Sequence, residues 1–146
     1  MRFNKHALAA VALLPILGSG SAFALSCVKS TNYIRLDVTQ VKTLLIGQTV
    51  CYPQSGPYEN QESLDKAGNV TDFKKGPSDK VDPTKVVGAY TVTTDGYITY
   101  NYIGGGSYTY QIFGNTSTLG PGTWDFCNGA APITVRVVAG TSGCGS

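Results

Sequence analysis

The chain has 146 residues and a hydrophobic content of 42%, which suits one domain with a core of its own. Its 11 Lys and Arg nearly balance its 9 Asp and Glu, so it lacks the strong positive charge that attracts nucleic acid or an anionic membrane. The only histidine is His6, so a histidine-based catalytic or metal site is excluded from any chain that has lost its N-terminal residues.

The N-terminal segment has the pattern of an export signal. Its first residues are basic, residues 7–17 form an apolar run too short to span a bilayer, and residues 22–24 are Ala-Phe-Ala, as before a cleavage site. We predict that residues 1–24 are a signal peptide and that residues 25–146 form a single domain, secreted or periplasmic and free of the membrane. Cleavage would bring the net charge to zero and remove His6. We therefore predict no catalytic residues, no metal site, no cofactor and no binding of nucleic acid.

Four cysteines in an exported chain predict two disulfide bonds. Cys51 and Cys127 each alternate with apolar neighbours, so both would point away from the core and could meet across adjacent strands. We expect Cys51 to pair with Cys127 and Cys27 to pair with Cys144, while the two other connectivities stay open. The cysteines lack the Cys-x-x-Cys spacing of a zinc site.

A short helix is predicted near the start of the mature chain. Asp37 and Gln40 have the spacing of a capping box, and Gly47 provides a stop signal. Three apolar residues would then share one face and cover an open end of a sheet: Val41, Leu44 and Leu45. An alternative interpretation makes a strand of the alternating apolar residues Ile34, Leu36 and Val38.

Strands are predicted from residue 48 onward. Residues 48–53 form the first, and residues 58–64 and 70–73 form a hairpin. The hairpin lies in the most highly charged part of the chain. Its acidic residues are therefore expected on a solvated face rather than as the paired carboxylates of a glycosidase: Glu59, Glu62 and Asp65.

The most regular pattern lies between residues 86 and 113. It predicts a meander of three strands, 86–93, 97–103 and 107–113, with one turn through Gly96 and another through the three glycines 104–106. The expected cross-strand pairs are Tyr90 with Tyr100, Tyr100 with Tyr110, and Ile98 with Ile112. Because side chains alternate along a strand, one face would carry five tyrosines: Tyr90, Tyr100, Tyr102, Tyr108 and Tyr110.

Two further strands follow a loop at 114–122. Residues 123–128 place Trp124 and Phe126 on one face, and residues 133–138 turn alternate apolar side chains inward. About eight regularly spaced strands with one short N-terminal helix predict an all-β domain. We favour a small antiparallel up-and-down barrel, with a two-sheet β-sandwich as the alternative.

These features resemble the small secreted lipocalin-like and avidin-like barrels, the calycins. The resemblance lies in the strand number, the capping helix, the export signal and Gly88-Ala89-Tyr90 at the start of a strand, where that family has Gly-x-Trp on its first strand. Here tyrosine replaces tryptophan and the motif lies in the middle of the chain. Arg136 on the last strand is similar to the arginine that the family packs over its tryptophan. The resemblance implies a closed barrel with a ligand cavity.

The tyrosines are the main indication of function. A buried tyrosine hydroxyl needs a partner, so a dry core would favour phenylalanine, although tyrosine is also a common strand residue. We expect a non-catalytic binding module whose pocket or face uses the five tyrosines and Trp124 to hold a small apolar or amphipathic ligand or a glycan. The alternatives are a structural or adhesive surface protein acting through protein contacts, and a small secreted inhibitor or effector. The oligomeric state is left open.

Overall fold

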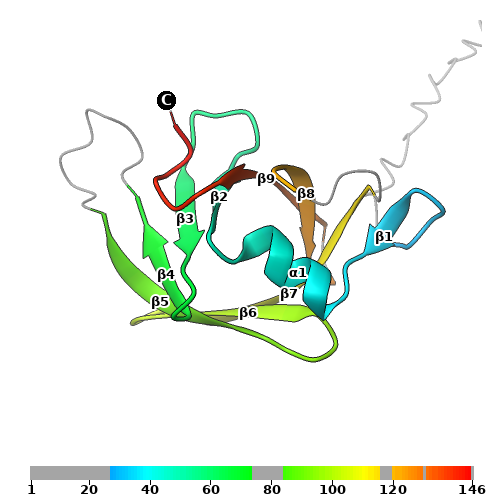
Figure 1. Ribbon diagram of the computed structural model, residues 1–146, viewed down its shortest axis with the longest axis horizontal. Helices are drawn as coiled ribbons and strands as arrows, with labels where there is room; N and C mark the ends of the chain where they lie inside the picture. The colour runs from blue at the N-terminus through cyan, green and yellow to red at the C-terminus, as the bar shows by residue number, and fades with distance from the viewer. Residues whose placement is uncertain (1–26, 74–83, 116–119, 130, 146) are drawn as a thin grey trace, which may run out of the picture.

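The computed structural model describes residues 27–73, 84–115, 120–129 and 131–145 (Figure 1). The expected signal peptide, residues 1–24, and residues 116–119 of the expected loop lie outside this part of the chain. The described residues form nine strands and one helix. In chain order these are β1 (Tyr33–Arg35), α1 (Val38–Leu45), β2 (Gln48–Tyr52), β3 (Asn60–Leu64), β4 (Asn69–Asp72), β5 (Lys85–Val92), β6 (Tyr97–Tyr102), β7 (Ser107–Asn115), β8 (Gly122–Cys127) and β9 (Ile133–Ala139).

Strands β2 to β9 form a closed antiparallel barrel. Each strand pairs with the next along the chain, and β9 pairs with β2 to complete the ring. This confirms the all-β barrel and excludes the two-sheet sandwich for the described residues. The short strand β1 lies outside the ring and pairs with the C-terminal end of β7, where Tyr33 lies opposite Asn115. It contains Ile34 of the alternative strand interpretation, whereas Val38 begins α1, so a short strand and the predicted helix are both present.

Helix α1 covers one end of the barrel, as predicted. The Asp37 side chain accepts a hydrogen bond from the Gln40 backbone N–H, and the Gln40 side chain accepts one from the Asp37 backbone N–H, which forms the capping box. The apolar face of α1, with Val41 and Leu45 fully buried, packs against β2, β5 and β6 (Figure 1). No helix in the described part of the chain is long and apolar enough to cross a bilayer.

The core lies between α1 and the middle of the barrel. It is built from the inward-facing side chains of the strands, and the fully buried members include Leu64, Val70, Ile98, Ile112 and Val137. Burial of these side chains removes apolar surface from water and supplies the main free energy of folding.

The first turn of the meander has the predicted geometry. Gly96 has a φ of 76°, in the left-handed region that favours glycine, and its N–H donates to the Thr93 carbonyl oxygen at 3.0 Å. Tyr90 therefore lies opposite Tyr100, as expected. The loop length predicted from the sequence is confirmed.

The second turn differs from the prediction by a shift of two residues. Tyr100 lies opposite Tyr108 rather than Tyr110, and Ile98 lies opposite Tyr110 rather than Ile112. The turn begins earlier than expected, as the hydrogen bond from the Tyr102 N–H to the Gly106 carbonyl oxygen at 3.2 Å shows. A shift of two residues keeps every side chain on its predicted face, since the side-chain period of a strand is two.

The disulfide pairing predicted from the sequence is wrong. The bonds join Cys27 to Cys127 and Cys51 to Cys144, with Cα atoms 6.1 and 5.9 Å apart. The reason lies in the strand order, because β9 separates β2, which carries Cys51, from β8, which carries Cys127. Two strands two positions apart in a sheet are about 10 Å apart, beyond the Cα separation of about 7 Å that a disulfide can span.

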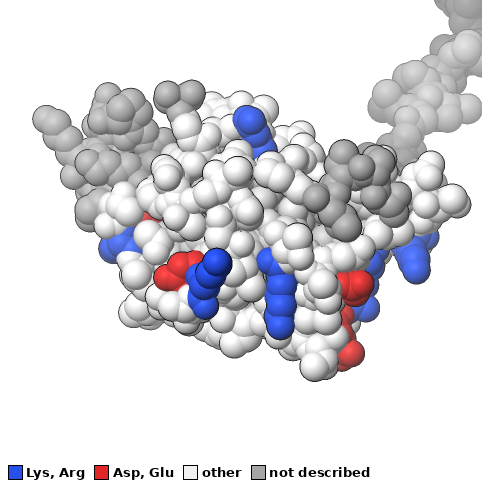
Figure 2. Space-filling model, viewed as in Figure 1, with Lys and Arg blue, Asp and Glu red and all other residues white. Residues whose placement is uncertain are grey.

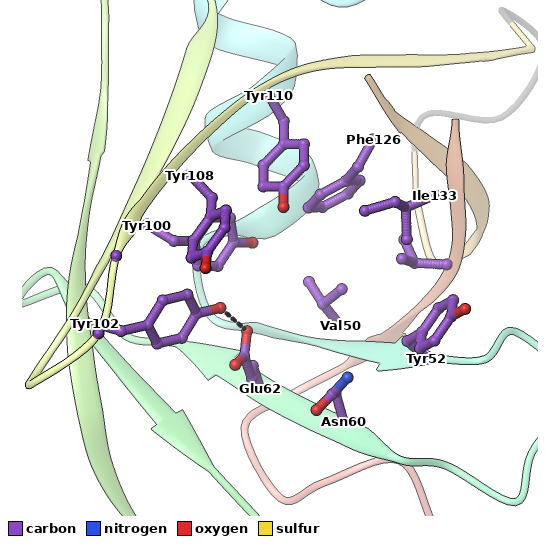
Figure 3. Close-up of a pocket in the computed structure, with 13 residues that line it drawn as sticks. Val50, Tyr52, Asn60, Glu62, Tyr100, Tyr102, Tyr108, Tyr110, Phe126 and Ile133 are labelled. Atoms are coloured by element: carbon purple, nitrogen blue, oxygen red, sulfur yellow. Dashed lines mark hydrogen bonds between the residues drawn. The ribbon is translucent and has the colours of Figure 1, made fainter. Parts of the chain in front are cut away.

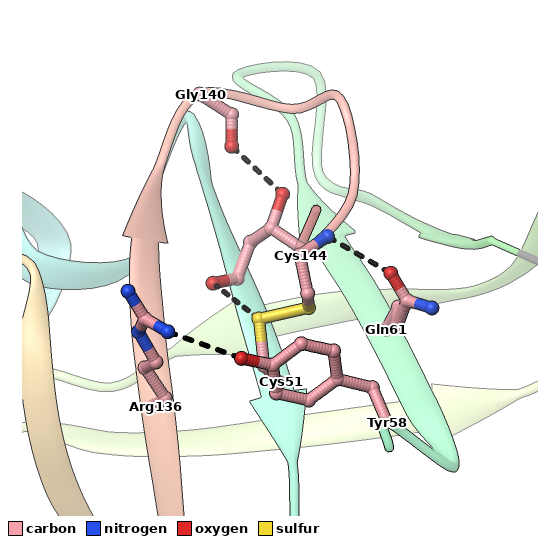
Figure 4. Close-up of a disulfide and its surroundings, with 7 residues drawn as sticks. Cys51, Tyr58, Gln61, Arg136, Gly140 and Cys144 are labelled. Atoms are coloured by element: carbon pink, nitrogen blue, oxygen red, sulfur yellow. Dashed lines mark hydrogen bonds between the residues drawn. A yellow bond between two sulfur atoms is a disulfide. The ribbon is translucent and has the colours of Figure 1, made fainter. Parts of the chain in front are cut away.

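The C-terminal segment is held against the outside of the barrel by the second disulfide (Figure 4). The Cys144 N–H donates to the Gln61 side-chain oxygen at 2.9 Å, and the Thr49 hydroxyl donates to the Gly140 carbonyl oxygen at 2.8 Å. Cys51 is fully buried beneath this segment. Two disulfides in a chain of this size fit an oxidising compartment.

Candidate functional site

A pocket opens at the end of the barrel that α1 does not cover. Strand β2 runs from α1 to this pocket, and the turn between β6 and β7 forms part of its rim. The pocket has a volume of about 580 Å³, within the range of about 300–1,000 Å³ typical of small-molecule sites. It is lined by side chains from β2, β3, β6, β7, β8 and β9, of which most are aromatic or aliphatic.

Four of the five predicted tyrosines line this pocket (Figure 3). Tyr100 and Tyr102 come from β6, and Tyr108 and Tyr110 come from β7. The Tyr102 ring meets the Tyr108 ring edge-on at 5.9 Å between centroids, and the Tyr110 ring lies 5.6 Å from that of Phe126. Within each of these two neighbouring strands the tyrosines are two residues apart, so all four rings lie on the same face of the sheet and form one wall of the pocket.

Tyr100 has a buried hydroxyl without a hydrogen-bond partner. Its side chain is 2% exposed, and its hydroxyl makes no hydrogen bond within the described residues. Burial and, secondarily, the nearby Glu62 carboxylate hold the pKa of Tyr100 well above its ordinary value, so the group stays neutral. A buried hydroxyl that lacks a partner costs about 1–3 kcal/mol. The hydroxyl of Tyr100 is therefore an unpaired donor and acceptor that lies beneath the surface of the pocket.

Glu62 lies inside the barrel, which corrects the prediction of a solvated face. Its carboxylate lines the pocket and accepts a hydrogen bond from the Tyr102 hydroxyl at 2.8 Å (Figure 3). Burial raises the pKa of Glu62 and the charge of Asp72 adds to the rise, while the hydrogen bond from Tyr102 opposes it. The pKa of Tyr102 is raised in turn, first by burial and then by Glu62.

The other two acidic residues of the hairpin have structural or solvated positions. Glu59 is exposed, as predicted. The Asp65 carboxylate accepts hydrogen bonds from the backbone N–H groups of Ala67 and Asn69, both at 2.8 Å, and these bonds, with that from the Asn69 side chain, lower its pKa. Asp65 therefore closes the turn between β3 and β4 and does not reach the pocket with Glu62.

Tyr90 and Trp124, also predicted to bind ligand, do not line this pocket. Tyr90 packs in the core, and its hydroxyl donates to the Asp65 carbonyl oxygen. Trp124 is 3% exposed, and its indole N–H donates to the Gly120 carbonyl oxygen at 3.0 Å. Both side chains have partners of their own within the fold, so we assign them a structural role.

The family resemblance implied that Arg136 packs over a tryptophan, and the structure shows that it does not. It lies opposite Cys51 and Thr123 on the outer face of the barrel, and its guanidinium donates to the Tyr58 hydroxyl at 3.1 Å (Figure 4). The described residues contain no group of three or more His, Cys, Asp or Glu side chains that could hold a metal ion.

The half-buried position of Glu62 predicts a pH-dependent gain of stability on its replacement. Because its pKa in the folded protein lies above the ordinary value of 4.5, the folded state binds the proton more tightly than the unfolded state. The contribution of Glu62 to the free energy of unfolding therefore declines as pH rises from that value through the folded pKa. We expect Glu62→Gln, which keeps an acceptor for the Tyr102 hydroxyl, to become more stable relative to wild type between about pH 4 and about pH 7.5.

Urea unfolding across this pH range measures the effect. Glu59→Gln is the matched control for the loss of one charge, since Glu59 is exposed. If the stability of Glu62→Gln falls relative to that of the wild type as pH rises, the raised pKa of Glu62 in the folded protein is contradicted.

Comparison with known proteins identifies no relative: no protein-family model matches the chain, and no curated protein or solved structure is significantly similar to it.

Proposed function

We propose that the chain is an exported, non-catalytic binding protein whose tyrosine-lined pocket holds a small apolar or amphipathic molecule. The observation that carries the proposal is the Tyr100 hydroxyl, which is buried at the pocket and has no hydrogen-bond partner. Because the hydroxyl has no exposed surface in the ligand-free protein, an occupant with one polar group would reach it after a small displacement of the neighbouring side chains. The apolar part of the occupant would cover the rings of Tyr102 and Tyr110. The two disulfides support an oxidising, extracytoplasmic location.

A second candidate function is contact with another protein through the turn between β6 and β7. Ile103 is 76% exposed at this turn, and the neighbouring Tyr108 is 49% exposed. Two exposed apolar side chains at one turn could form part of a surface that contacts another protein.

Native mass spectrometry of the mature protein purified from its own host tests the first proposal. We expect a monomer that carries a discrete extra mass, which denaturation without reductant releases. Tyr100→Phe should weaken retention of that mass by about five- to tenfold, the value of one hydrogen bond, while the ligand-free protein becomes no less stable. Weaker binding without a loss of stability would show that the hydroxyl contributes to ligand binding and does not stabilise the fold.

Tyr97→Phe is the matched control, because Tyr97 lies on the outer face of the same strand, where its hydroxyl accepts a hydrogen bond from the Gln111 side chain. It should leave the bound mass unchanged. A ligand-free protein that forms a ladder of oligomers, lost on Ile103→Ser, would instead favour the second candidate.

A further inference from the structure

The pocket contains one charged side chain, and that charge is negative. Among the described residues that line it, Glu62 is the one with a carboxylate, and none is Lys or Arg. Asp72 lies opposite Glu62 on β4, and Lys85 lies opposite Asp72 on β5, so Asp72 has a cation beside it on the sheet. Charges of both signs are scattered over the face shown in Figure 2. Selection by charge would therefore come from the pocket itself.

The Glu62 carboxylate has hydrogen-bonding capacity left. A carboxylate has about four acceptor positions, and the hydroxyl of Tyr102 occupies one of them. Tyr100 lines the same pocket, and its unpaired hydroxyl lies beneath the pocket surface, where its oxygen would be a further acceptor once the neighbouring side chains move. A donor that carries several N–H groups would fit this arrangement.

The aromatic side chains beside Glu62 also favour positive charge. Figure 3 shows the rings of Tyr102, Tyr108 and Tyr110 around the space toward which the Glu62 side chain points. The face of an aromatic ring carries negative potential and attracts an ammonium group, most strongly where water is excluded. The same rings and the aliphatic side chains of Val50 and Val135 would cover an apolar body attached to that group.

We propose that the pocket selects organic cations, in which a protonated amine lies against Glu62 and the hydroxyl of Tyr100 while an apolar or aromatic body lies among the tyrosine rings. This inference rests on the proposed function and specifies the class of its ligand. Glu62 is half-buried, so a ligand that covers its carboxylate removes the remaining hydration, and an ammonium partner offsets that loss. A neutral ligand does not offset it, and an anion is repelled by Glu62.

Three indoles of nearly the same shape test the inference: tryptamine, which is a cation at neutral pH, tryptophol, which is neutral, and indole-3-acetate, which is an anion. The probes are titrated by calorimetry into the ligand-free, disulfide-intact protein at about pH 7.5. We expect tryptamine to bind at least about tenfold more tightly than tryptophol, and indole-3-acetate to bind most weakly.

Glu62→Gln should lower the affinity for tryptamine and remove most of its preference over tryptophol, while the affinity for tryptophol does not fall. Glu59→Gln, which removes an exposed carboxylate outside the pocket, should keep the preference of the wild type. Equal binding of tryptamine and tryptophol to the wild type would overturn the selection of cations but leave the proposed pocket function in place. No binding of any probe at millimolar concentration would overturn the inference, and the absence of a co-purified mass as well would count against the proposed function.

Discussion

Replacement of Cys51 and Cys144 by alanine is expected to lower the free energy of unfolding by about 4 kcal/mol. The disulfide joins residues 93 positions apart, so it removes a large amount of chain entropy from the unfolded state. In the folded state it also holds the C-terminal segment over β2 and β3, where Cys144 bonds Gln61. Guanidinium unfolding of the double variant and of the wild type gives the difference.

The same experiment contains its own control. Alanine replacement of Cys27 and Cys127, which are 100 positions apart, should cost a similar amount if chain entropy dominates. Wild-type protein with both bonds reduced should then match the variant that lacks all four cysteines. A loss below about 1 kcal/mol for the Cys51 and Cys144 pair would mean that the reduced unfolded chain is already compact there.

The second large effect is expected at Gly88. A Cβ atom at this position would lie 2.3 Å from the backbone oxygen of Asn101 and 3.1 Å from the Cα atom of Tyr102. These are backbone atoms of the neighbouring strand β6, which a small side-chain movement cannot relieve. We expect Gly88→Ala to lower the free energy of unfolding by about 3 kcal/mol, the upper part of the usual range for overpacking.

Gly88→Ala is also expected to disturb the pocket, because Tyr102 lies directly opposite Gly88 and carries the hydrogen bond to Glu62. Thermal unfolding and tryptamine titration of the variant measure the two effects. Gly120→Ala is the control, since a Cβ atom there would meet no atom within 4 Å. A Gly88→Ala variant as stable as this control would show that β5 and β6 can separate without loss.

The close approach at Gly88 explains the glycine that suggested the family resemblance. Strand β5 is irregular here, because Val70 on β4 lies opposite Gly88 while Thr71 lies opposite Val86. Such a bulge bends the strand and brings it close to its neighbour. The motif Gly88-Ala89-Tyr90 therefore reflects the curvature of this barrel, and the side chain of Tyr90 belongs to the core.

Local patterns were sufficient to predict the elements and the faces of their side chains. The capping box at Asp37 and the turn at Gly96 each depend on a few neighbouring residues, so the sequence specifies them directly. The turn between β6 and β7 was less well specified. Several loop lengths around its glycines place Tyr100 and Tyr110 on one face, so alternation could not distinguish between registers two residues apart.

Features that depend on the order of strands could not be predicted in this way. The position of β9 between β2 and β8 keeps Cys51 away from Cys127, and it depends on the pairing of the first strand of the ring, β2, with the last, β9. Glu62 was assigned to the surface because of the charges around it. The alternation of β3, in which Glu62 lies opposite Val50 and two residues before the fully buried Leu64, was the signal that could have placed it inside.

The pairing of β2 with β9 has a consequence for the folding of the protein. The first strand of the ring finds its final partner only when β9 is free to pair, so β2 keeps an unsatisfied edge until the ring closes. Closing so long a loop loses entropy before the new contacts form, which favours slow folding. During that interval the exposed edge is a site for association between chains, and a factor that shields it would raise the yield of monomer.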